Sequence, residues 1–245
     1  MKTTPNPDLH VLEDNKQRWN HPAHRRHGFH NAHNLFRRAW MVRSRHVLDL
    51  SDAPSAKLGS LPEIARLTGH AVFSALVVAR GSQILYANAA QDFSIDRPHS
   101  IQSISKLHIH LIVGYLVNEG LLDCTKTVAH YLPDIGSGYA NATVQMLLDM
   151  NVVNDFSEDY SDPNSDCYTE EIALGWRLPA NDGPETALVD FVVGITGSDL
   201  QNWSGVAVYK SANTDVLTLI CAKVSPRPLA KLIEDIADAA GYQGA

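Results

Sequence analysis

Several features common in other protein classes are scarce or missing in this sequence. Only three of its 245 residues are cysteines, and they show no Cys-x-x-Cys spacing. Three widely spaced cysteines predict neither a disulfide framework nor a cysteine zinc site. No uncharged apolar run reaches the roughly 18 residues of a membrane span, and MKTTPNPDLHVLEDNKQRW has no apolar core of a signal peptide. We therefore expect a cytoplasmic protein with no membrane partner.

An excess of positive charge is also missing. Twenty Lys and Arg residues stand against 27 Asp and Glu residues, for a formal net charge of −7. This balance gives no electrostatic reason to expect a nucleic-acid partner. A chain of this length with 44% hydrophobic and 19% charged residues is expected to be globular, with one core or one domain that carries a large insertion.

Histidines recur at three-residue steps near the start of the chain, at His21, His24, His27, His30 and His33. On an α-helix each step of three lags by about 60°, so the rings would fan around the axis instead of converging. Pro22 and Gly28 also disfavour a regular helix, and no Cys, Asp or Glu lies among the histidines to complete a metal site. We predict an N-terminal arm over residues 1–60, with no metal and no other cofactor.

Hydrophobic periodicity predicts the elements that follow the arm. Alternation in AVFSALVVARGSQILYANAA predicts a hairpin around residues 80–83. LHIHLIVGYLVNEG is expected to be a helix buried on most sides, and ATVQMLLDM a short helix from Thr143. NVVNDFSEDYSDPNSDCYTEE is expected to be a loop, either a solvated surface or the wall of a site. SGVAVYKSANTDVLTLICAKV predicts a short strand, a polar turn and a helix, and PLAKLIEDIADAA a last amphipathic helix.

Ser103 and Lys106 form the only Ser-x-x-Lys in the chain. A serine is a poor nucleophile unless a neighbour takes its proton, and a lysine three residues later on a helix returns to the same face. Ser103 also falls at a predicted helix start, where unpaired backbone N–H groups favour a developing negative charge. One such match in 245 residues also arises by chance, so a second element is needed.

Ser-x-x-Lys is the nucleophile motif of class A β-lactamases and penicillin-binding proteins, and a proton-shuttling tyrosine in Tyr-x-Asn or Tyr-x-Ser is then expected. Tyr-Ala-Asn occurs at Tyr86, upstream of the serine, and at Tyr139, only 36 residues downstream in a Gly/Ser turn. Tyr209-Lys210-Ser211 lies 106 residues downstream, which leaves room for a helical subdomain, and it has the strand-turn-helix setting. We therefore predict Tyr209 as the partner of Ser103.

The runs SISK, VQMLLDM, SEDYSDP, ALGWR and YKSANTDVL, in this order and spacing, resemble the 6-aminohexanoate-dimer hydrolases. These enzymes form the class C β-lactamase-like branch of the serine hydrolases. The resemblance spans roughly residues 70–225. It implies an α+β, β-lactamase/transpeptidase-like fold, with an antiparallel sheet, packed helices and an inserted helical subdomain at about 115–202 of a domain at 61–245.

The resemblance also implies roles for individual residues. Ser103 would be the acylated nucleophile, Lys106 its deprotonating partner and Tyr209 the general acid/base toward the leaving amine. Ser211 would orient this pair. Tyr160 would line the substrate cleft, and Glu171 would face the amine end of an amide substrate, although the family often has Asp there. The alternatives are an ordinary loop tyrosine and a solvated carboxylate at a helix start.

A third motif of the family, Lys-x-Gly or His-x-Gly, does not follow Tyr209 in this sequence. In the family that strand donates the second backbone N–H of the oxyanion hole, and loss of one such donor costs about 2.7–4 kcal/mol in the transition state. We therefore expect a chain that lacks the C-terminal third of its relatives, with a sheet incomplete on that side.

Two functions remain open on the sequence alone. The first is a serine hydrolase, an amidase or esterase acting on small linear amides or esters through an acyl-enzyme on Ser103, in truncated form. The second is a non-catalytic β-lactamase-like binding protein or an inactive fragment. The expected partner is a small-molecule substrate, and homo-oligomer formation is compatible with either function.

Overall fold

A computed structural model of the chain describes residues 19–34, 40–177, 179, 183–197 and 206–244. These residues fall into two compact units, one within residues 101–233 and the other made of 19–100 with 234–244. Each unit is described by itself. Within the described ranges, no helix has the length and apolarity needed to cross a lipid bilayer.

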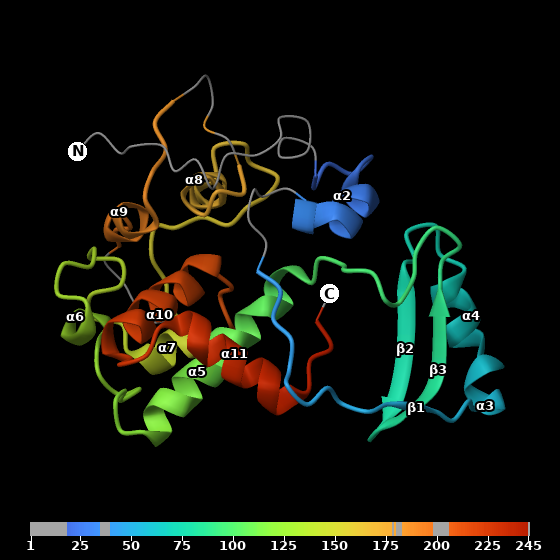
Figure 1. The fold of residues 1–245 in the computed structure, drawn as a ribbon. Coiled ribbons are helices and arrows are strands. Elements are labelled where there is room, and N and C mark those ends of the chain that lie inside the picture. Colours follow the sequence, from blue (N-terminus) through green and yellow to red (C-terminus); the bar gives the residue numbers. More distant parts are fainter. Residues whose placement is uncertain (1–18, 35–39, 178, 180–182, 198–205, 245) are drawn as a thin grey trace. The chain divides into compact units, whose positions relative to one another are not determined.

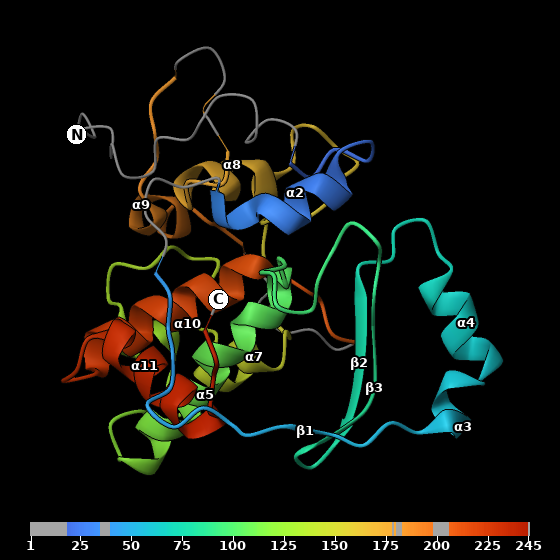
Figure 2. The same ribbon diagram turned by 45° about the vertical axis from the view of Figure 1, so that its right-hand side comes forward.

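The sheet lies in the unit that contains residues 19–100. β2 (Ala75–Arg80) and β3 (Gln83–Ala89) pair antiparallel, with Arg80 opposite Gln83, so the predicted hairpin is confirmed. Gly81 has a φ of +58°, a conformation that glycine adopts without strain in a two-residue hairpin turn. β1 (Ser51–Asp52) adds a short parallel strand beside β3, in the order β1-β3-β2. α3 (Ala56–Gly59) and α4 (Pro62–Thr68) lie to the same side of this sheet in both views (Figure 1, Figure 2).

The histidine-rich segment contains a helix that the sequence analysis did not predict. α2 spans Arg25–Asn31 and is followed by the 3₁₀ turn η2 (Ala32–Asn34). Gly28 lies within α2, and no larger residue fits there because a Cβ would come within 2.0 Å of the Trp19 carbonyl oxygen. The glycine that lowers helix propensity is therefore required for close backbone packing. No group of three or more His, Cys, Asp or Glu side chains suited to hold a metal occurs in the described part of the chain.

A cluster around the hydroxyl of Ser74 joins α2 to the sheet region of the same unit. Nε2 of the buried His30 lies 2.7 Å from Ser74 Oγ, and Nε2 of His99 lies 3.2 Å from the same oxygen. The His30 ring stacks on Phe93 at a centroid distance of 4.3 Å. These contacts fix the helix that carries His30 to segments near both strands of the hairpin.

The other unit is helical in its described residues. Its elements are η3 (Gln102–Lys106), α5 (Leu107–Asn118), α6 (Val128–Tyr131), α7 (Val144–Leu148), α8 (Asp166–Ala173), α9 (Leu188–Val193) and α10 (Ser211–Val224). α10 packs against α5, α6, α7 and α9 (Figure 1). The core consists of fully buried side chains, including Leu116, Val128, Val144, Leu147, Val216, Leu217 and Ile220. α11 (Leu229–Ala240) confirms the last predicted helix and is shared between the two units.

Three predictions for this unit need correction. α5 is not buried on most sides: Ile112, Val113 and Leu116 are buried, whereas Leu107 and Leu111 are 56% and 57% exposed. Residues 151–171 are not all loop, because α8 begins at Asp166. Residues 206–210 do not form the predicted strand, although the Val208 N–H donates to the Met150 carbonyl at 2.7 Å. The first part of that predicted strand lies outside the described residues.

Candidate active site

The serine and lysine of the Ser-x-x-Lys motif meet on the 3₁₀ turn η3, directly before α5. Side chains three residues apart eclipse one another on a 3₁₀ helix, and the Lys106 ammonium donates to Ser103 Oγ at 3.1 Å. Ser103 itself is exposed. The turn therefore presents a solvent-accessible hydroxyl with a cation at its side.

The backbone just before Ser103 is strained. Gln102 has a φ of +48°, in the left-handed region that costs a non-glycine residue roughly 1–2 kcal/mol. Its carbonyl accepts a hydrogen bond from the Ser105 hydroxyl at 2.6 Å. This conformation turns the chain sharply at the residue that precedes the exposed serine.

Tyr209 approaches Ser103 from the segment that leads into α10. Its hydroxyl donates to Ser103 Oγ at 2.7 Å, across a sequence separation of 106 residues. Lys106 Nζ lies 5.7 Å from the centroid of the Tyr209 ring. Both groups therefore direct a donor to the same serine oxygen, and negative charge that develops on that oxygen would be stabilised.

The two other tyrosines that were considered lie elsewhere. The Tyr139 side chain is fully buried, and its hydroxyl donates to Asn213 Oδ1 at 2.9 Å. Burial raises the pKa of Tyr139 well above its ordinary value. Tyr86 belongs to β3, in the other unit. Of the three candidates, the structure brings Tyr209 to Ser103.

The segment around Tyr209 alternates its side chains. Lys210 has an extended backbone, so its side chain points away from those of its neighbours. It is buried and donates to the Phe156 carbonyl oxygen, and this burial lowers the pKa of Lys210. Lys210 thus anchors the segment while Tyr209 stays 48% exposed.

Glu158 organises the predicted substrate-side residues, and the sequence analysis assigned it no role. Its carboxylate accepts from the Ser211 backbone N–H at 2.5 Å and from the Ser211 hydroxyl at 2.8 Å. The Tyr160 hydroxyl donates to the same carboxylate at 3.1 Å. Glu158 therefore joins the start of α10 to the loop that carries Tyr160. The acid two residues before Tyr160 in the SEDYSDP run was the available signal.

Tyr160 and Glu171 belong to a second polar network. Tyr168 donates to the Tyr160 carbonyl at 2.8 Å, and the Arg177 guanidinium lies 4.4 Å from the centroid of the Tyr168 ring. Arg177 Nε pairs with Glu171 Oε2 at 2.9 Å. Burial raises the pKa of Glu171, and Arg177 opposes that shift. The carboxylate predicted to meet a substrate amine thus already has a cationic partner within the chain.

Two further carboxyls, the buried Glu170 and the half-buried Asp215, lie close enough to interact with Lys106. Glu170 of α8 is 3% exposed, and Asp215 lies in the first two turns of α10. The charge of Lys106 favours the ionised form of both groups. Neither residue was predicted from the sequence. Glu170 lies on α8, which was expected to be a loop, and Asp215 lies four residues beyond the end of the Tyr-x-Ser motif.

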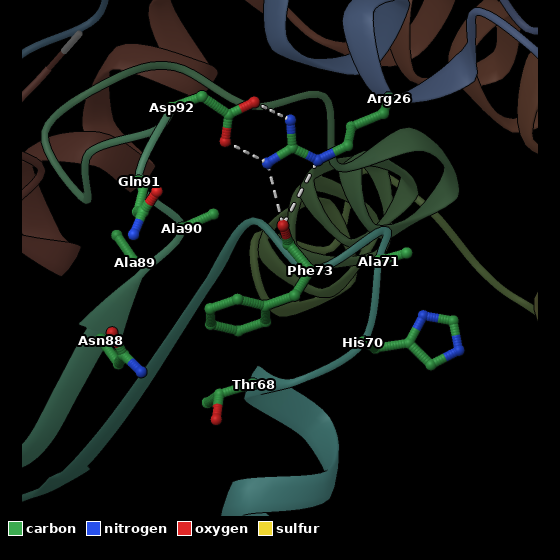
Figure 3. A pocket seen from close by; sticks show the side chains of 10 residues that line it. All are labelled: Arg26, Thr68, His70, Ala71, Phe73, Asn88, Ala89, Ala90, Gln91 and Asp92. Atoms are coloured by element: carbon green, nitrogen blue, oxygen red, sulfur yellow. Dashed lines mark hydrogen bonds and ion pairs between the residues drawn. The ribbon is translucent and has the colours of Figure 1, made fainter.

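A hollow of about 410 Å³ lies in the other unit, and none of the predicted site residues lines it (Figure 3). Arg26 lines this hollow and forms a bidentate ion pair with Asp92. The same guanidinium donates to the Phe73 carbonyl at 3.0 and 3.3 Å. Because the charged groups of this wall satisfy one another, we do not treat the hollow as the candidate site.

Known proteins resemble the chain in both sequence and fold. It is 34% identical, over 166 residues, to a 6-aminohexanoate-dimer hydrolase from Paenarthrobacter ureafaciens; this match covers 67% of the chain and 41% of that protein. A solved structure from Bacillus anthracis, provisionally assigned as a 6-aminohexanoate-dimer hydrolase, aligns with a TM-score of 0.73 at 19% identity. That alignment covers 98% of the chain and 63% of the structure.

The chain thus spans less than two thirds of the length of these relatives. The structural alignment supports the α+β, β-lactamase/transpeptidase-like fold expected from the sequence. The described sheet is the three-stranded one given above. Residues 64–241 match the family described as Beta-lactamase, and the chain therefore belongs to the beta-lactamase family.

Proposed function

We propose that this chain carries the reactive centre of a serine hydrolase that cleaves small linear amides or esters through an acyl-enzyme on Ser103. The observation that carries the proposal is the convergence of the Lys106 ammonium and the Tyr209 hydroxyl on Ser103 Oγ, at 3.1 and 2.7 Å. Membership in a family of hydrolases supports the same reading.

The proton inventory of this cluster defines the first step. Lys106 and Tyr209 both donate to Ser103 Oγ, so one of them has to lose a proton before it can accept the serine proton. Ser103 Oγ then bonds to the carbonyl carbon of the substrate, and the proton passes to the deprotonated partner. That proton moves to the leaving amine or alcohol as its bond to the acyl carbon breaks. Water then attacks the acyl carbon, gives a proton to the same base and releases Ser103 with its proton restored.

The substrate class rests on the relatives and on the groups near the serine. The curated relative is named for the hydrolysis of a 6-aminohexanoate dimer, a small linear amide. For this chain we assign Tyr160 to the wall of the acyl or amine pocket, and Ser211 to the orientation of Tyr209. Glu171 would meet a substrate amine together with Arg177, which pairs with it in this structure.

Covalent labelling tests the proposal directly. The wild-type chain is treated with a fluorophosphonate, and the modified residue is located by mass spectrometry. We expect one adduct on Ser103 and a loss of labelling of at least about 100-fold in Ser103→Ala. Ser74→Ala is the matched control because Ser74 also lies within hydrogen-bond distance of two side chains, and it should label like the wild type.

Labelling that survives Ser103→Ala would remove Ser103 from the mechanism. An unlabelled but folded chain that still binds a linear amide would support the non-catalytic binding protein instead. A chromogenic short-chain ester and the matching anilide, assayed with the same variants, then distinguish esterase from amidase turnover.

A further inference from the structure

Glu170 and Asp215 each carry a buried carboxyl oxygen that has no hydrogen-bond donor among the described residues. The unpaired atoms are Glu170 Oε1 and Asp215 Oδ2, and both are sealed from solvent. The Glu170 side chain comes from α8 and is 3% exposed, whereas Asp215 comes from α10. A buried polar atom without a partner is destabilising, so this arrangement requires an explanation.

A single proton on the pair would supply the missing hydrogen bond. An ionised carboxylate can only accept hydrogen bonds, whereas a protonated carboxyl also donates one. The two carboxyls interact with each other, and burial together with Asp215 raises the pKa of Glu170 far above its ordinary value. Burial also raises the pKa of Asp215, while its interaction with Glu170 opposes that shift. Glu170 therefore retains the proton, and Asp215 carries the single negative charge.

The pair interacts with Lys106, one of the two side chains that donate to Ser103. Asp215 is four residues after Ser211 on α10, so the two share one face of that helix. Two other charged groups act on both carboxyls: Lys106 of η3 attracts their negative charge, and Glu158 of the loop before α8 repels it. α5 packs against α10 and contributes His110, whose buried Nε2 has no hydrogen-bond partner among the described residues.

We propose that Glu170 and Asp215 share one proton, and that this singly charged pair is the buried counter-ion that holds the Lys106 ammonium toward Ser103. Both are positioning residues, since they act on the serine through Lys106. The positioning half of this inference rests on the proposed function, whereas the shared proton does not. Two experiments keep the two halves apart.

The first experiment counts the shared proton through the pH dependence of unfolding. The folded chain keeps a proton that an unfolded Glu170 releases above its ordinary pKa of 4.5. The unfolding equilibrium constant, measured in urea from about pH 5 to pH 9, should therefore rise with pH by up to about tenfold per pH unit from this group. In Glu170→Gln the amide donates to Asp215 without a titrating proton, so this contribution should disappear.

The control variant Glu119→Gln changes an exposed acid in the same unit. Its unfolding equilibrium constant should rise with pH as steeply as that of the wild type. The series is repeated in His110→Gln to remove any contribution of that histidine. If Glu170→Gln and the wild type have equal slopes in both backgrounds, the shared proton is refuted.

The second experiment tests whether the negative charge of the pair, rather than the shape of its side chains, controls the labelling of Ser103. Glu170→Gln retains the negative charge on Asp215, so fluorophosphonate labelling of Ser103 should stay within about threefold of the wild type. Asp215→Asn leaves a buried protonated Glu170 and no anion, and labelling should fall about tenfold with a changed pH profile. A purely structural role would change labelling in parallel with stability in both variants.

Equal labelling in folded Asp215→Asn and wild type would refute the positioning role. An unlabelled wild type would overturn the proposed function and the positioning role with it. The slope in Glu170→Gln would still decide whether the proton is shared.

Discussion

Two serines of this chain lie between pairs of polar side chains, and the two arrangements differ in their proton inventory. Ser74, in one unit, has His30 and His99 at 2.7 and 3.2 Å. Ser103, in the other, has Tyr209 and Lys106 at 2.7 and 3.1 Å. Distance alone does not separate a structural serine from a reactive one.

At Ser74 the donors and acceptors balance. His99 Nδ1 lies 2.8 Å from the Ser100 carbonyl, so Nδ1 carries a hydrogen, and Nε2 is placed to accept the hydrogen of the Ser74 hydroxyl. Ser74 Oγ then accepts from His30 Nε2. Every donor and acceptor around Ser74 then has a partner, as expected of a structural contact.

At Ser103 the donors are in excess. Lys106 and Tyr209 both donate to Ser103 Oγ, and neither of them accepts the hydrogen of the Ser103 hydroxyl. This arrangement is better suited to an oxygen with negative charge than to a neutral hydroxyl. The comparison indicates that proton inventory, together with exposure, distinguishes the two serines.

Removal of one partner from each serine gives the largest expected contrast. Tyr209→Phe should lower fluorophosphonate labelling of Ser103 about 100-fold or more, because proton transfer by a positioned side chain contributes 10²–10⁴-fold. His99→Phe should leave labelling within about twofold. Circular dichroism of both variants controls for folding. Equal losses in the two variants would show that the comparison is wrong.

The pH dependence of stability tests the neutral state of the Ser74 cluster. Burial, then the positive charges of Arg26 and Arg97, lower the pKa of His30, and Asp92 opposes this shift. Below an unfolded pKa of 6.5 the unfolded chain takes up a proton that the folded chain does not. The unfolding equilibrium constant should therefore rise as pH falls below 6.5, by at most about tenfold per pH unit.

This contribution should be absent in His30→Gln, so the urea midpoint of the wild type should fall relative to that of the variant only on the acidic side. A constant difference across the series would argue against a neutral His30 in the folded state.

The smallest expected effect comes from the strained residue before Ser103. Gln102→Gly relieves a left-handed conformation but increases the freedom of the unfolded chain. The two contributions nearly cancel, so the free energy of unfolding should change by less than about 1 kcal/mol. A looser turn should slow labelling of Ser103 by roughly threefold to tenfold. Faster labelling in this variant would show that the strain hinders the serine.

Much of the candidate site follows from local rules. The spacing of Ser103 and Lys106 predicts side chains on one face, and η3 brings them together. Tyr209 followed from element order and from the room needed for intervening helices, and it does reach Ser103. Their catalytic roles stay predictions until labelling is measured. The hairpin and the last helix were predictable because their periodicity is strong.

The carboxyls around this cluster could not be predicted in the same way. Glu170 lies on α8, which begins inside a segment whose Asp, Asn, Ser and Pro content favours a loop. Asp215 faces Glu170 only because α8 and α10 belong to one packed unit. The role of Glu158 depends on the backbone N–H at the start of α10. Such contacts arise from tertiary packing, which residue spacing does not encode.

Local exposure in α5 and helix formation in α2 also differ from the sequence-based predictions. α5 is apolar enough to suggest burial all round, yet Leu107 and Leu111 stay exposed in this structure. Gly28 argued against α2, but the tight contact with the Trp19 backbone outweighs its propensity. In both cases the neighbouring segment, rather than the element itself, decides the outcome.

The 106 residues between Ser103 and Tyr209 also bear on how the chain folds. Closing a loop of that length costs about 4 kcal/mol in chain entropy, so this contact cannot form early unless the intervening helices have already shortened the path. Lys106, by contrast, meets Ser103 as soon as one turn forms. Reactivity that needs all three groups should therefore emerge after most of the helical unit has assembled. Pulse labelling of Ser103 during refolding would time the arrival of Tyr209 and thereby the docking of α10.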